Sequence, residues 1–483
     1  MHARVIQALQ SIVGPQYVLT EPQDLVCYSF DATWHTGRPD VVVLPAETRQ
    51  VQEIVRLAAA ERIPVTPRGA GTGLAGGAVP VRGGILLSLT RMRRIVDIDT
   101  RNLLAVVEPG VVTAELQRQV AREGLFYPPD PASAKVSTIG GNIATGAGGP
   151  RCFKYGVTRD YVLGLEVVLA SGEVLRTGGK TVKNVTGYDL TRLLVGSEGT
   201  LGVITGATLR LIPQPETQRT LLGVFPRLAD ASAAVGDIVA KGIVPTTLEL
   251  VDQTALRVVE DYLQAGLPVE AEAVLIIEVD GFAEAVDRQA RRVAELCEAH
   301  GASAVRVAAD AAQAAELWQA RRAINPSLTR IRPIKVGEDV TVPPGEIPAF
   351  IRRFQYLRER YRDLPMVVYG HAGDGNLHPN VVMDPRRPEE RARVEAWLAD
   401  LARVALDLGG TLTGEHGIGL LKAPFLEWEV GPVGMEVMRA VKRALDPLNI
   451  LNPGKMALDG PQATEAAPAA EPGPAPTGGG TRG

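Results

Sequence analysis

Four residues near the C-terminal end of the chain have types and spacing suited to metal and proton-transfer chemistry. His371 and His378 flank a turn-forming segment, Ala-Gly-Asp-Gly-Asn, with strand-like apolar runs on either side. A hairpin there would bring the two imidazoles near one another across its strands. Glu415 and His416 are adjacent in a second motif, TGEHGIG. The alternative interpretation is that these histidines are packing residues whose polar atoms are satisfied.

A carboxylate arriving from elsewhere in the chain would complete the set that the hairpin begins. Two imidazole nitrogens and one carboxylate oxygen suit zinc, manganese or iron. The chain has only six histidines, and three of them lie in these two short motifs. This concentration favours a functional cluster over scattered packing residues.

Three glycine-rich stretches point to a second kind of chemistry. They span residues 67–78 (PRGAGTGLAGGA), 128–156 and 185–205. Glycine has no Cβ, so backbone N–H groups in such loops can close on a phosphate. The first stretch alone holds five glycines, more than a flexible turn needs.

Two familiar phosphate-binding motifs are excluded. Gly71, Gly73 and Gly76 match G-x-G-x-x-G, but a dinucleotide site of that kind needs a helix immediately afterwards. Here Pro80 and a strand-like run (ILLSL) follow. Lys180-Thr181 fails as a phosphate loop, because the required first glycine would fall at Val174.

The composition indicates small-molecule chemistry. The chain has 483 residues, 45% of them hydrophobic, and a net charge of −4, so no overall basic field attracts nucleic acid or anionic lipid. The three cysteines lie far apart in the sequence, which fits a reducing cytoplasm and excludes an iron–sulfur cluster held by this chain alone. No apolar run reaches the roughly 18 residues of a membrane span, and the N-terminus does not read as a signal peptide.

The elements that must position these motifs follow an α+β pattern. Residues 40–68 read as strand, helix and strand, with the helix capped by Thr48. Its buried face would carry Val51, Ile54, Val55 and Ala58. After the segment 212–215, strand-like runs alternate with alanine-rich helices, which predicts an antiparallel sheet with flanking helices. We expect a helical segment at 1–36, domains at 37–215 and 216–456, and a disordered Pro/Ala/Gly-rich tail at 457–483.

Together these motifs resemble the FAD-linked oxidase family as far as the segment 449–455. The family joins a two-subdomain FAD-binding domain of the vanillyl-alcohol-oxidase (PCMH) type to a C-terminal substrate, or cap, domain. Its members include D-lactate dehydrogenases, D-2-hydroxyglutarate dehydrogenases and the FAD subunit of bacterial glycolate oxidase. The resemblance implies FAD-dependent oxidation of a small 2-hydroxy acid to the 2-keto acid.

The resemblance also implies which residues contact FAD. The first loop offers Ala70, Thr72 and Leu74 but no histidine, so we expect FAD to be held non-covalently. The implied FAD contacts are Arg68, Gly69, Ala70, Gly71, Thr72, Gly73, Gly76, Gly77, Ala78, Pro129, Asp130, Pro131, Ser137, Thr138, Gly140, Gly141, Asn142, Gly148, Gly149, Gly156, Ile204 and Asn452.

In the C-terminal half, the resemblance assigns roles to the residues first noted above. It implies His371, His378 and Glu415 as ligands of a divalent metal, and His416 as the general base. Arg321 would bind the substrate carboxylate, because a guanidinium grips a carboxylate bidentately. Asn325 and Lys335 are weaker candidates for substrate contact. The alternative for Arg321 and Arg322 is a solvated helix face.

Three other hypotheses remain open at this point. The substrate could be a larger acid such as D-2-hydroxyglutarate instead of glycolate or D-lactate. The chain could be a non-catalytic FAD-binding subunit, or a metal hydrolase without flavin. The resemblance to glycolate oxidase implies an iron–sulfur subunit and a second FAD-type subunit as partners, with a cytoplasmic chain held at the membrane only through them.

Overall fold

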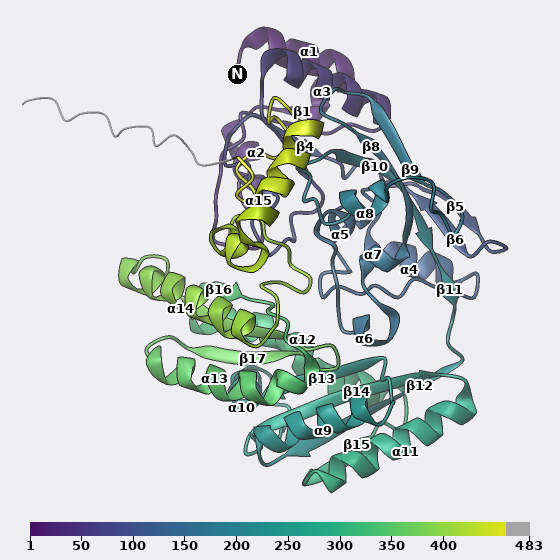
Figure 1. Ribbon diagram of the computed structural model, residues 1–483, viewed down its shortest axis with the longest axis vertical. Helices are drawn as coiled ribbons and strands as arrows, with labels where there is room; N and C mark the ends of the chain where they lie inside the picture. Colours follow the sequence, from purple (N-terminus) through teal and green to yellow (C-terminus); the bar gives the residue numbers. More distant parts are fainter. Residues whose placement is uncertain (460–483) are drawn as a thin grey trace, which may run out of the picture.

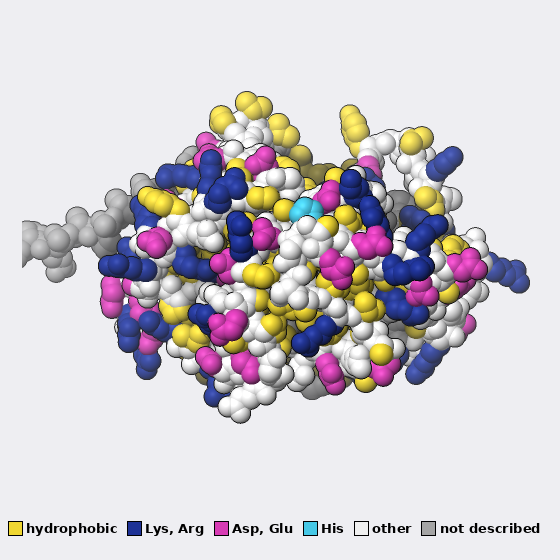
Figure 2. All heavy atoms as spheres, turned by 90° about the horizontal axis from the view of Figure 1, so that it is seen from below, with side chains coloured by type: hydrophobic (Ala, Val, Ile, Leu, Met, Phe, Trp, Pro, Cys, Tyr) yellow, Lys and Arg dark blue, Asp and Glu magenta, His cyan; other side chains and the backbone are white. Residues whose placement is uncertain are grey.

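The computed structural model describes residues 1–459, so the predicted disordered tail lies almost wholly outside the described residues. Figure 1 shows the N-terminal half above and the C-terminal half below. The architecture is α+β, with the antiparallel sheet that the sequence predicts in the second half. Within residues 1–459, no helix combines the length and the hydropathy that a bilayer crossing requires. The face in Figure 2 carries basic and acidic side chains interspersed, in keeping with the small net charge.

The first sheet of the N-terminal half has four strands in the order β1-β2-β4-β3. Their bounds are β1 Val18–Leu19, β2 Val41–Val43, β4 Ile85–Ser88 and β3 Val65–Arg68. Strands β2, β4 and β3 are parallel, and β1 joins antiparallel at the edge, so the predicted N-terminal helical segment also supplies a strand. Helices α1 (Ala3–Val13) and α3 (Thr48–Glu61) pack their apolar faces on this sheet.

The predicted cap of α3 is wrong. Glu47 holds the N-cap position, and Thr48 is already the first helical residue. The Thr48 hydroxyl instead donates to Glu166 Oε1 at 2.7 Å and ties the helix to the neighbouring sheet. The predicted buried face is confirmed, since its four apolar residues are fully buried.

The second sheet of the N-terminal half is antiparallel, with the order β5-β6-β10-β8-β9. The strands are β5 Ile95–Asp99, β6 Leu104–Val107, β10 Val203–Arg210, β8 Val162–Val168 and β9 Val174–Gly178. Helices α4 (Thr113–Ala121) and α5 (Ile139–Thr145) bury apolar side chains against it. Short helices α6 (Cys152–Tyr155), α7 (Thr158–Tyr161) and α8 (Leu190–Leu194) and the pair β7 (Leu125–Phe126) and β11 (Ile212–Pro213) fill the connections.

The C-terminal half is built on a seven-stranded antiparallel sheet of order β15-β12-β14-β13-β17-β18-β16. The strands are β15 Ala304–Val307, β12 Thr217–Phe225, β14 Ala273–Gly281, β13 Thr247–Asp252, β17 Met366–His371, β18 Asn376–Met383 and β16 Ile334–Gly337. Strands β17 and β18 form the predicted hairpin, with Tyr369 opposite His378.

The two faces of this sheet differ in polarity because side chains alternate along each strand. Leu248 and Leu250 of β13 point into the main hydrophobic core. That core is closed by α9 (Leu228–Ala240), α11 (Ala283–Ala299), α13 (Ile347–Arg360) and α14 (Pro388–Asp407). Thr247 and Glu249 point to the opposite face, which α10 (Gln253–Leu263) and α12 (Ala311–Ile331) cover only in part. The uncovered part of that face is polar and forms the floor of the site described below.

The last described segment returns to the N-terminal half. Helix α15 (Leu426–Leu445) lies beside the N-terminal elements in Figure 1. Val441 and Leu445 pack on the core of the five-stranded sheet, and Ile450 and Leu451 belong to the core of the four-stranded sheet. The TGEHGIG motif therefore lies on a stretch of chain that crosses from one half to the other.

Candidate active site

Two adjoining cavities occupy the region between the two halves. One, of about 550 Å³, is lined by the glycine-rich stretches and is called the glycine-rich cavity below. The other, of about 780 Å³, lies over the polar face of the seven-stranded sheet and is called the histidine cavity. Glu415 and His416 line both cavities, as do Leu74, Ala132 and Asn325. A group bound in either cavity therefore faces the Glu-His pair.

Most of the predicted FAD contacts line the glycine-rich cavity. Those that do are Arg68, Gly69, Ala70, Gly71, Thr72, Gly73, Gly77, Ala78, Pro131, Ser137, Thr138, Gly140, Gly141, Asn142 and Ile204. Residues about 135 positions apart in the sequence thus meet around one space, as a single bound cofactor would require.

The first glycine-rich loop has the backbone features that a diphosphate-binding loop needs. Among the described residues, no hydrogen bond is donated by the backbone N–H groups of residues 69–77. Gly71 has φ +73°, and a Cβ on Gly69 would collide with the Thr138 hydroxyl. Free N–H donors in a loop without side-chain obstruction are what phosphate oxygens need. The loop therefore fits FAD.

The remaining predicted FAD contacts do not line this cavity: Gly76, Pro129, Asp130, Gly148, Gly149, Gly156 and Asn452. The Asn452 side-chain amide donates to the carbonyls of Gly77 (2.9 Å) and Glu198 (2.6 Å), so it braces the first loop from behind. Asp130 lines the histidine cavity instead and lies 3.3 Å from Arg151. Burial raises the pKa of Asp130 to about 7, although the Arg151 charge opposes this.

His371, His378 and Glu415 form one compact cluster, whose ligand atoms all lie within 4.8 Å of one another. The Nε2 atoms of the two histidines are 3.3 Å apart. Glu415 Oε1 lies 3.6 Å from Nε2 of His371 and 3.4 Å from Nε2 of His378. Two imidazole nitrogens and a carboxylate oxygen that converge in this way fit a divalent cation.

The other nitrogen of each imidazole is already engaged. Nδ1 of His371 contacts the Glu249 carboxylate, and Nδ1 of His378 lies 3.2 Å from the Glu338 carbonyl. In a neutral ring, a proton held on Nδ1 leaves the lone pair on Nε2, facing the cluster. Although burial opposes it, the Glu249 carboxylate raises the pKa of His371, so a cation entering the cluster would displace a proton from Nε2 of His371. Such outer partners fix the tautomer and the ring orientation of metal-binding histidines.

Glu249 is the charged centre of this arrangement. It is fully buried on β13, between His371 and Arg321, whose Nε lies 2.6 Å from Oε2. Although burial raises it, the pKa of Glu249 is held at about 2 by the charges of His371 and Arg321. Burial lowers the pKa of His378, and the neighbouring His371 and His416 lower it further, so His378 is neutral and able to act as a ligand.

His416 is held by a buried aspartate. Residues 413–419 are called the base loop below. Asp339 Oδ2 accepts the backbone N–H of Gly414 (3.0 Å), Glu415 (2.7 Å) and His416 (2.8 Å), while its other oxygen contacts the buried ammonium of Lys422. The His416 ring stacks on His378 with centroids 5.5 Å apart. Its Nδ1 lies 3.5 Å from Asp339 Oδ1, and its Nε2 lies 3.7 Å from Glu415 Oε1.

The predicted substrate contacts also line the histidine cavity. Arg321 lies over the Tyr369 ring at 4.3 Å from its centroid, and its side chain is 12% exposed, so the solvated-face alternative is wrong for Arg321. Asn325 accepts a hydrogen bond from the Tyr369 hydroxyl at 2.8 Å. Lys335 Nζ lies 3.2 Å from Asn380 Oδ1. Burial and the Arg321 charge lower the pKa of Lys335 to about 8.

Several residues of the site were not identified from the sequence. Glu249, Glu338 and Asp339 are buried carboxylates in strand-like runs, and Lys422 is a buried cation beside two of them. The available signal was an acidic residue flanked by apolar ones in a strand-like run, as Glu249 is by two leucines in TLELVD. A charged residue at such a position is rarely buried unless it has a partner, and the partner is distant in sequence.

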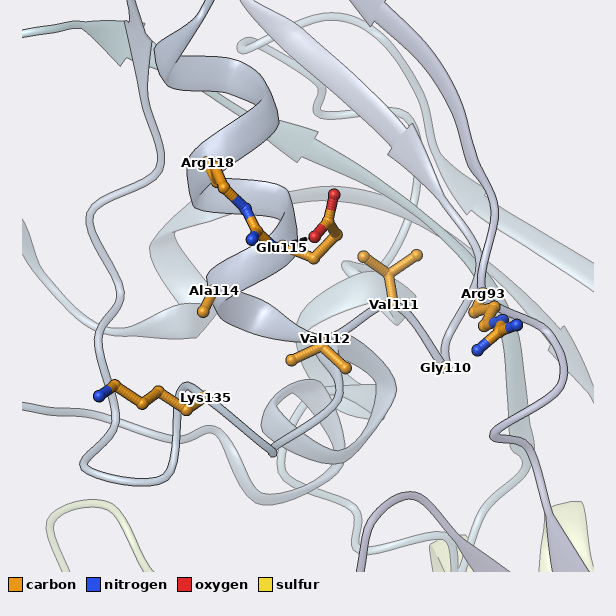
Figure 3. Close-up of a pocket in the computed structure, with 8 residues that line it drawn as sticks. All are labelled: Arg93, Gly110, Val111, Val112, Ala114, Glu115, Arg118 and Lys135. Carbon is orange, nitrogen blue, oxygen red and sulfur yellow. Dashed lines mark hydrogen bonds and ion pairs between the residues drawn. The ribbon is translucent and has the colours of Figure 1, made fainter.

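A third, more open depression of about 760 Å³ lies at the start of α4. Figure 3 shows Arg93, Arg118 and Lys135 around it, with Arg118 paired to Glu115. It shares Ala114 and Lys135 with the histidine cavity but holds none of the predicted site residues. Its basic side chains are exposed, and Lys135 lines both this depression and the histidine cavity.

Comparisons with known proteins cover both halves of the chain. A family model described as an FAD binding domain matches residues 39–178, and one described as the C-terminal domain of FAD linked oxidases matches residues 214–456. The glycolate oxidase subunit GlcD of Bacillus subtilis (strain 168) is 47% identical over 453 residues, covering 94% of this chain and 96% of that protein.

The chain is also similar to a second enzyme in sequence and to a solved structure in fold. A D-lactate dehydrogenase of Archaeoglobus fulgidus is 41% identical over 435 residues, covering 89% of this chain and 95% of that protein. The structure of p-cresol methylhydroxylase with substrate bound superimposes with a TM-score of 0.79 at 21% identity, covering 94% of this chain and 96% of that one. At that identity the structural match shows the fold alone.

Proposed function

The chain belongs to the FAD-linked oxidase family, and from this premise we propose that it oxidises a small 2-hydroxy acid, glycolate or D-lactate, to the 2-keto acid. The observation that supports this most is the position of Glu415 and His416, which line both the glycine-rich cavity and the histidine cavity. A substrate over the histidine cluster would lie beside any ring that projects from the glycine-rich cavity.

Two bound groups would supply chemistry that side chains lack. FAD, which the glycine-rich loops would hold non-covalently, would supply a two-electron oxidant for the α-hydrogen. His371, His378 and Glu415 would hold a divalent ion such as zinc, manganese or iron, which would supply a Lewis acid for the substrate hydroxyl.

The histidine cavity orients the substrate through its cations. Arg321 offers a guanidinium to the carboxylate, and Lys335 offers an ammonium from the neighbouring strand β16. Arg321 is itself held by Glu249, so its donor geometry is set before the substrate arrives. Preorganised donors of this kind reduce the entropy lost when the acid is bound in a reactive position.

His416 takes the hydroxyl proton at Nε2. Asp339 lies beside Nδ1 and favours a proton there, which leaves the Nε2 lone pair on the side of Glu415 and the cluster. Lys422 contacts both Asp339 and Glu338 and offsets part of their buried negative charge. Removal of the hydroxyl proton and departure of the α-hydrogen together convert the alcohol carbon into a carbonyl.

The test of this function is anaerobic mixing with glycolate, D-lactate, L-lactate and D-2-hydroxyglutarate, followed at the flavin absorption band. We expect glycolate or D-lactate to bleach the flavin, and acid precipitation of the same protein to release the flavin into the supernatant. If no 2-hydroxy acid bleaches a flavin-loaded protein, the proposed function is wrong.

A pH dependence of substrate binding follows from Lys335. Its pKa of about 8 means that the ammonium is present below that pH and is lost as the pH rises through it. We expect KM for the acid to rise by up to about tenfold per pH unit above about pH 8 as one cation is lost. In Lys335→Met, KM should be high and independent of pH over the same range. KM measured between about pH 6.5 and about pH 9.5 decides the matter; a flat wild-type profile contradicts the assignment.

A larger acid such as D-2-hydroxyglutarate is the second candidate. The histidine cavity, at about 780 Å³, extends well beyond the cluster to Arg322 and Lys135, where a second carboxylate would meet positive charge. The four-acid panel separates the two substrates. The assembled His371, His378, Glu415 and His416 cluster argues against a non-catalytic FAD-binding subunit, and the glycine-rich cavity argues against a flavin-free hydrolase.

The physiological electron acceptor belongs to this proposal as well. The similar Bacillus protein is named as a subunit, which supports partners that carry electrons away from the flavin. The three cysteines of this chain are all free and separate, so an iron–sulfur centre would have to be supplied by a partner subunit. We propose a cytoplasmic chain that reaches the membrane only through such partners.

A further inference from the structure

The base loop is gripped at its two ends by carboxylates from opposite halves of the molecule. Asp339, just beyond β16, accepts the N–H groups of residues 414–416. Glu198, from the third glycine-rich stretch, accepts the next free pair: Ile418 N–H at Oε1 (2.7 Å) and Gly419 N–H at Oε2 (2.9 Å). The N–H between them, on Gly417, donates to the Thr413 hydroxyl at 3.1 Å.

Glu198 is built into the wall of the glycine-rich cavity. It is 6% exposed and lines that cavity. Its own backbone is fixed on both sides, because its N–H donates to the Ala144 carbonyl (2.8 Å) and its carbonyl accepts from Asn452 (2.6 Å). Because the backbone of Glu198 is fixed in the cavity wall, its carboxylate holds the base loop at a fixed distance from that wall.

The backbone of Glu198 has φ +52°, a left-handed conformation that costs free energy for a residue with a Cβ. Two glycines lie close to its carboxylate oxygens. A Cβ on Gly417 would lie 2.8 Å from Oε1, and a Cβ on Gly77 would lie 3.3 Å from Oε2. The absence of side chains at Gly417 and Gly77 leaves space for the Glu198 carboxylate, and the left-handed backbone of Glu198 is kept although it is strained.

Burial raises the pKa of Glu198 to about 7, while the two N–H donors and the charges of Lys455 and Lys422 oppose that rise. A buried carboxylate is costly unless it is well satisfied. The two N–H contacts tie Glu198 to the base loop, since Ile418 and Gly419 lie two and three residues after His416.

We propose that Glu198 is a positioning residue that fixes the base loop, and through it His416, against the flavin-binding cavity. The proposal rests on the proposed function for the role of His416, while the loop contact itself does not. Asp339 sets the loop relative to the metal cluster, and Glu198 sets the same loop relative to the flavin. The two carboxylates act beside the Ala75 carbonyl, which accepts the N–H groups of Leu420 (2.7 Å) and Leu421 (3.1 Å) just beyond the base loop.

The test compares Glu198→Gln and Glu198→Asp with Glu108→Gln as a matched control. An amide presents only one acceptor and the shorter aspartate does not span both N–H groups. Glu108 is equally buried (7% exposed) in the same half, is bonded to Arg94, and lines neither of the two site cavities.

The first measurement is backbone hydrogen exchange of peptides covering residues 413–421. Both Glu198 variants should exchange faster there than the wild-type holoenzyme, and Glu108→Gln should not. Unchanged exchange in both Glu198 variants overturns the proposal. This readout needs no substrate, so it stands even if no 2-hydroxy acid reduces the flavin and the proposed function fails.

The second measurement is the rate of flavin reduction at saturating acid, together with FAD affinity from flavin fluorescence. Glu198→Gln should lose about 10²-fold in reduction rate, the scale of a misplacement of about 1 Å, with a much smaller change in KM. FAD affinity should stay near the wild-type value. If excess FAD restores the rate, Glu198 only holds the cofactor and the positioning role is wrong.

Discussion

His416→Ala is expected to slow reduction of the flavin by at least ~10²-fold while FAD remains bound, because the variant lacks the group that takes the hydroxyl proton. The imidazole lies where both cavities meet, with Nε2 toward the cluster and Nδ1 beside Asp339. Its neighbours are held by backbone contacts to Asp339, which do not involve the imidazole, so the loop should keep its shape. Rapid mixing with the acid under anaerobic conditions measures the rate directly.

The control for this variant is His300→Ala. His300 caps the C-terminal end of α11, far from the site in sequence, and its ring Nε2 lies 3.2 Å from Asp237 Oδ2. It should reduce flavin at the wild-type rate. Added imidazole should restore part of the rate to His416→Ala by entering the space of the missing ring. A native rate in His416→Ala would remove His416 from its assigned role.

Loss of the divalent ion is expected to slow flavin reduction by about 10²–10³-fold. Lewis-acid stabilisation is worth several kcal/mol, and each 1.4 kcal/mol changes the rate by a factor of about ten. The experiment removes the ion with a chelator and, separately, replaces His378 by alanine. Elemental analysis should find about one ion per chain before treatment and none afterwards. Zinc, manganese or iron added back should restore the chelated wild type but leave His378→Ala inactive.

Two further variants test how strongly the neighbours of the cluster affect metal affinity. Glu249→Gln keeps the three ligands but weakens the partner of His371, and outer partners of this kind are worth about 10–100-fold in metal affinity. Asp374→Asn changes a carboxyl group in the turn of the same hairpin that is outside the three-residue cluster, and it should keep its ion. Full activity in a protein shown to be free of metal would contradict the metal site.

Much of this site follows from local sequence. The β17–β18 hairpin is specified by its own turn, so the proximity of His371 and His378 could be predicted from residues 366–383 alone. The absence of a helix after Gly76 excluded a nicotinamide dinucleotide site without any coordinates. The glycine-rich loops and the TGEHGIG motif could also be identified from the sequence, because each is a short run of adjacent residues.

The contacts that hold these motifs in place could not be predicted in this way, because they join residues distant in sequence. Glu249 and His371 are 122 residues apart and meet because β13 pairs with β17 in the seven-stranded sheet. Glu198 and Ile418 are 220 residues apart and meet where the chain crosses back to the N-terminal half. The local sequence determines the turns and the spacing of the motifs. The pairing of buried charges depends on the order of strands in the sheet and on the exclusion of water, and only the tertiary structure decides these.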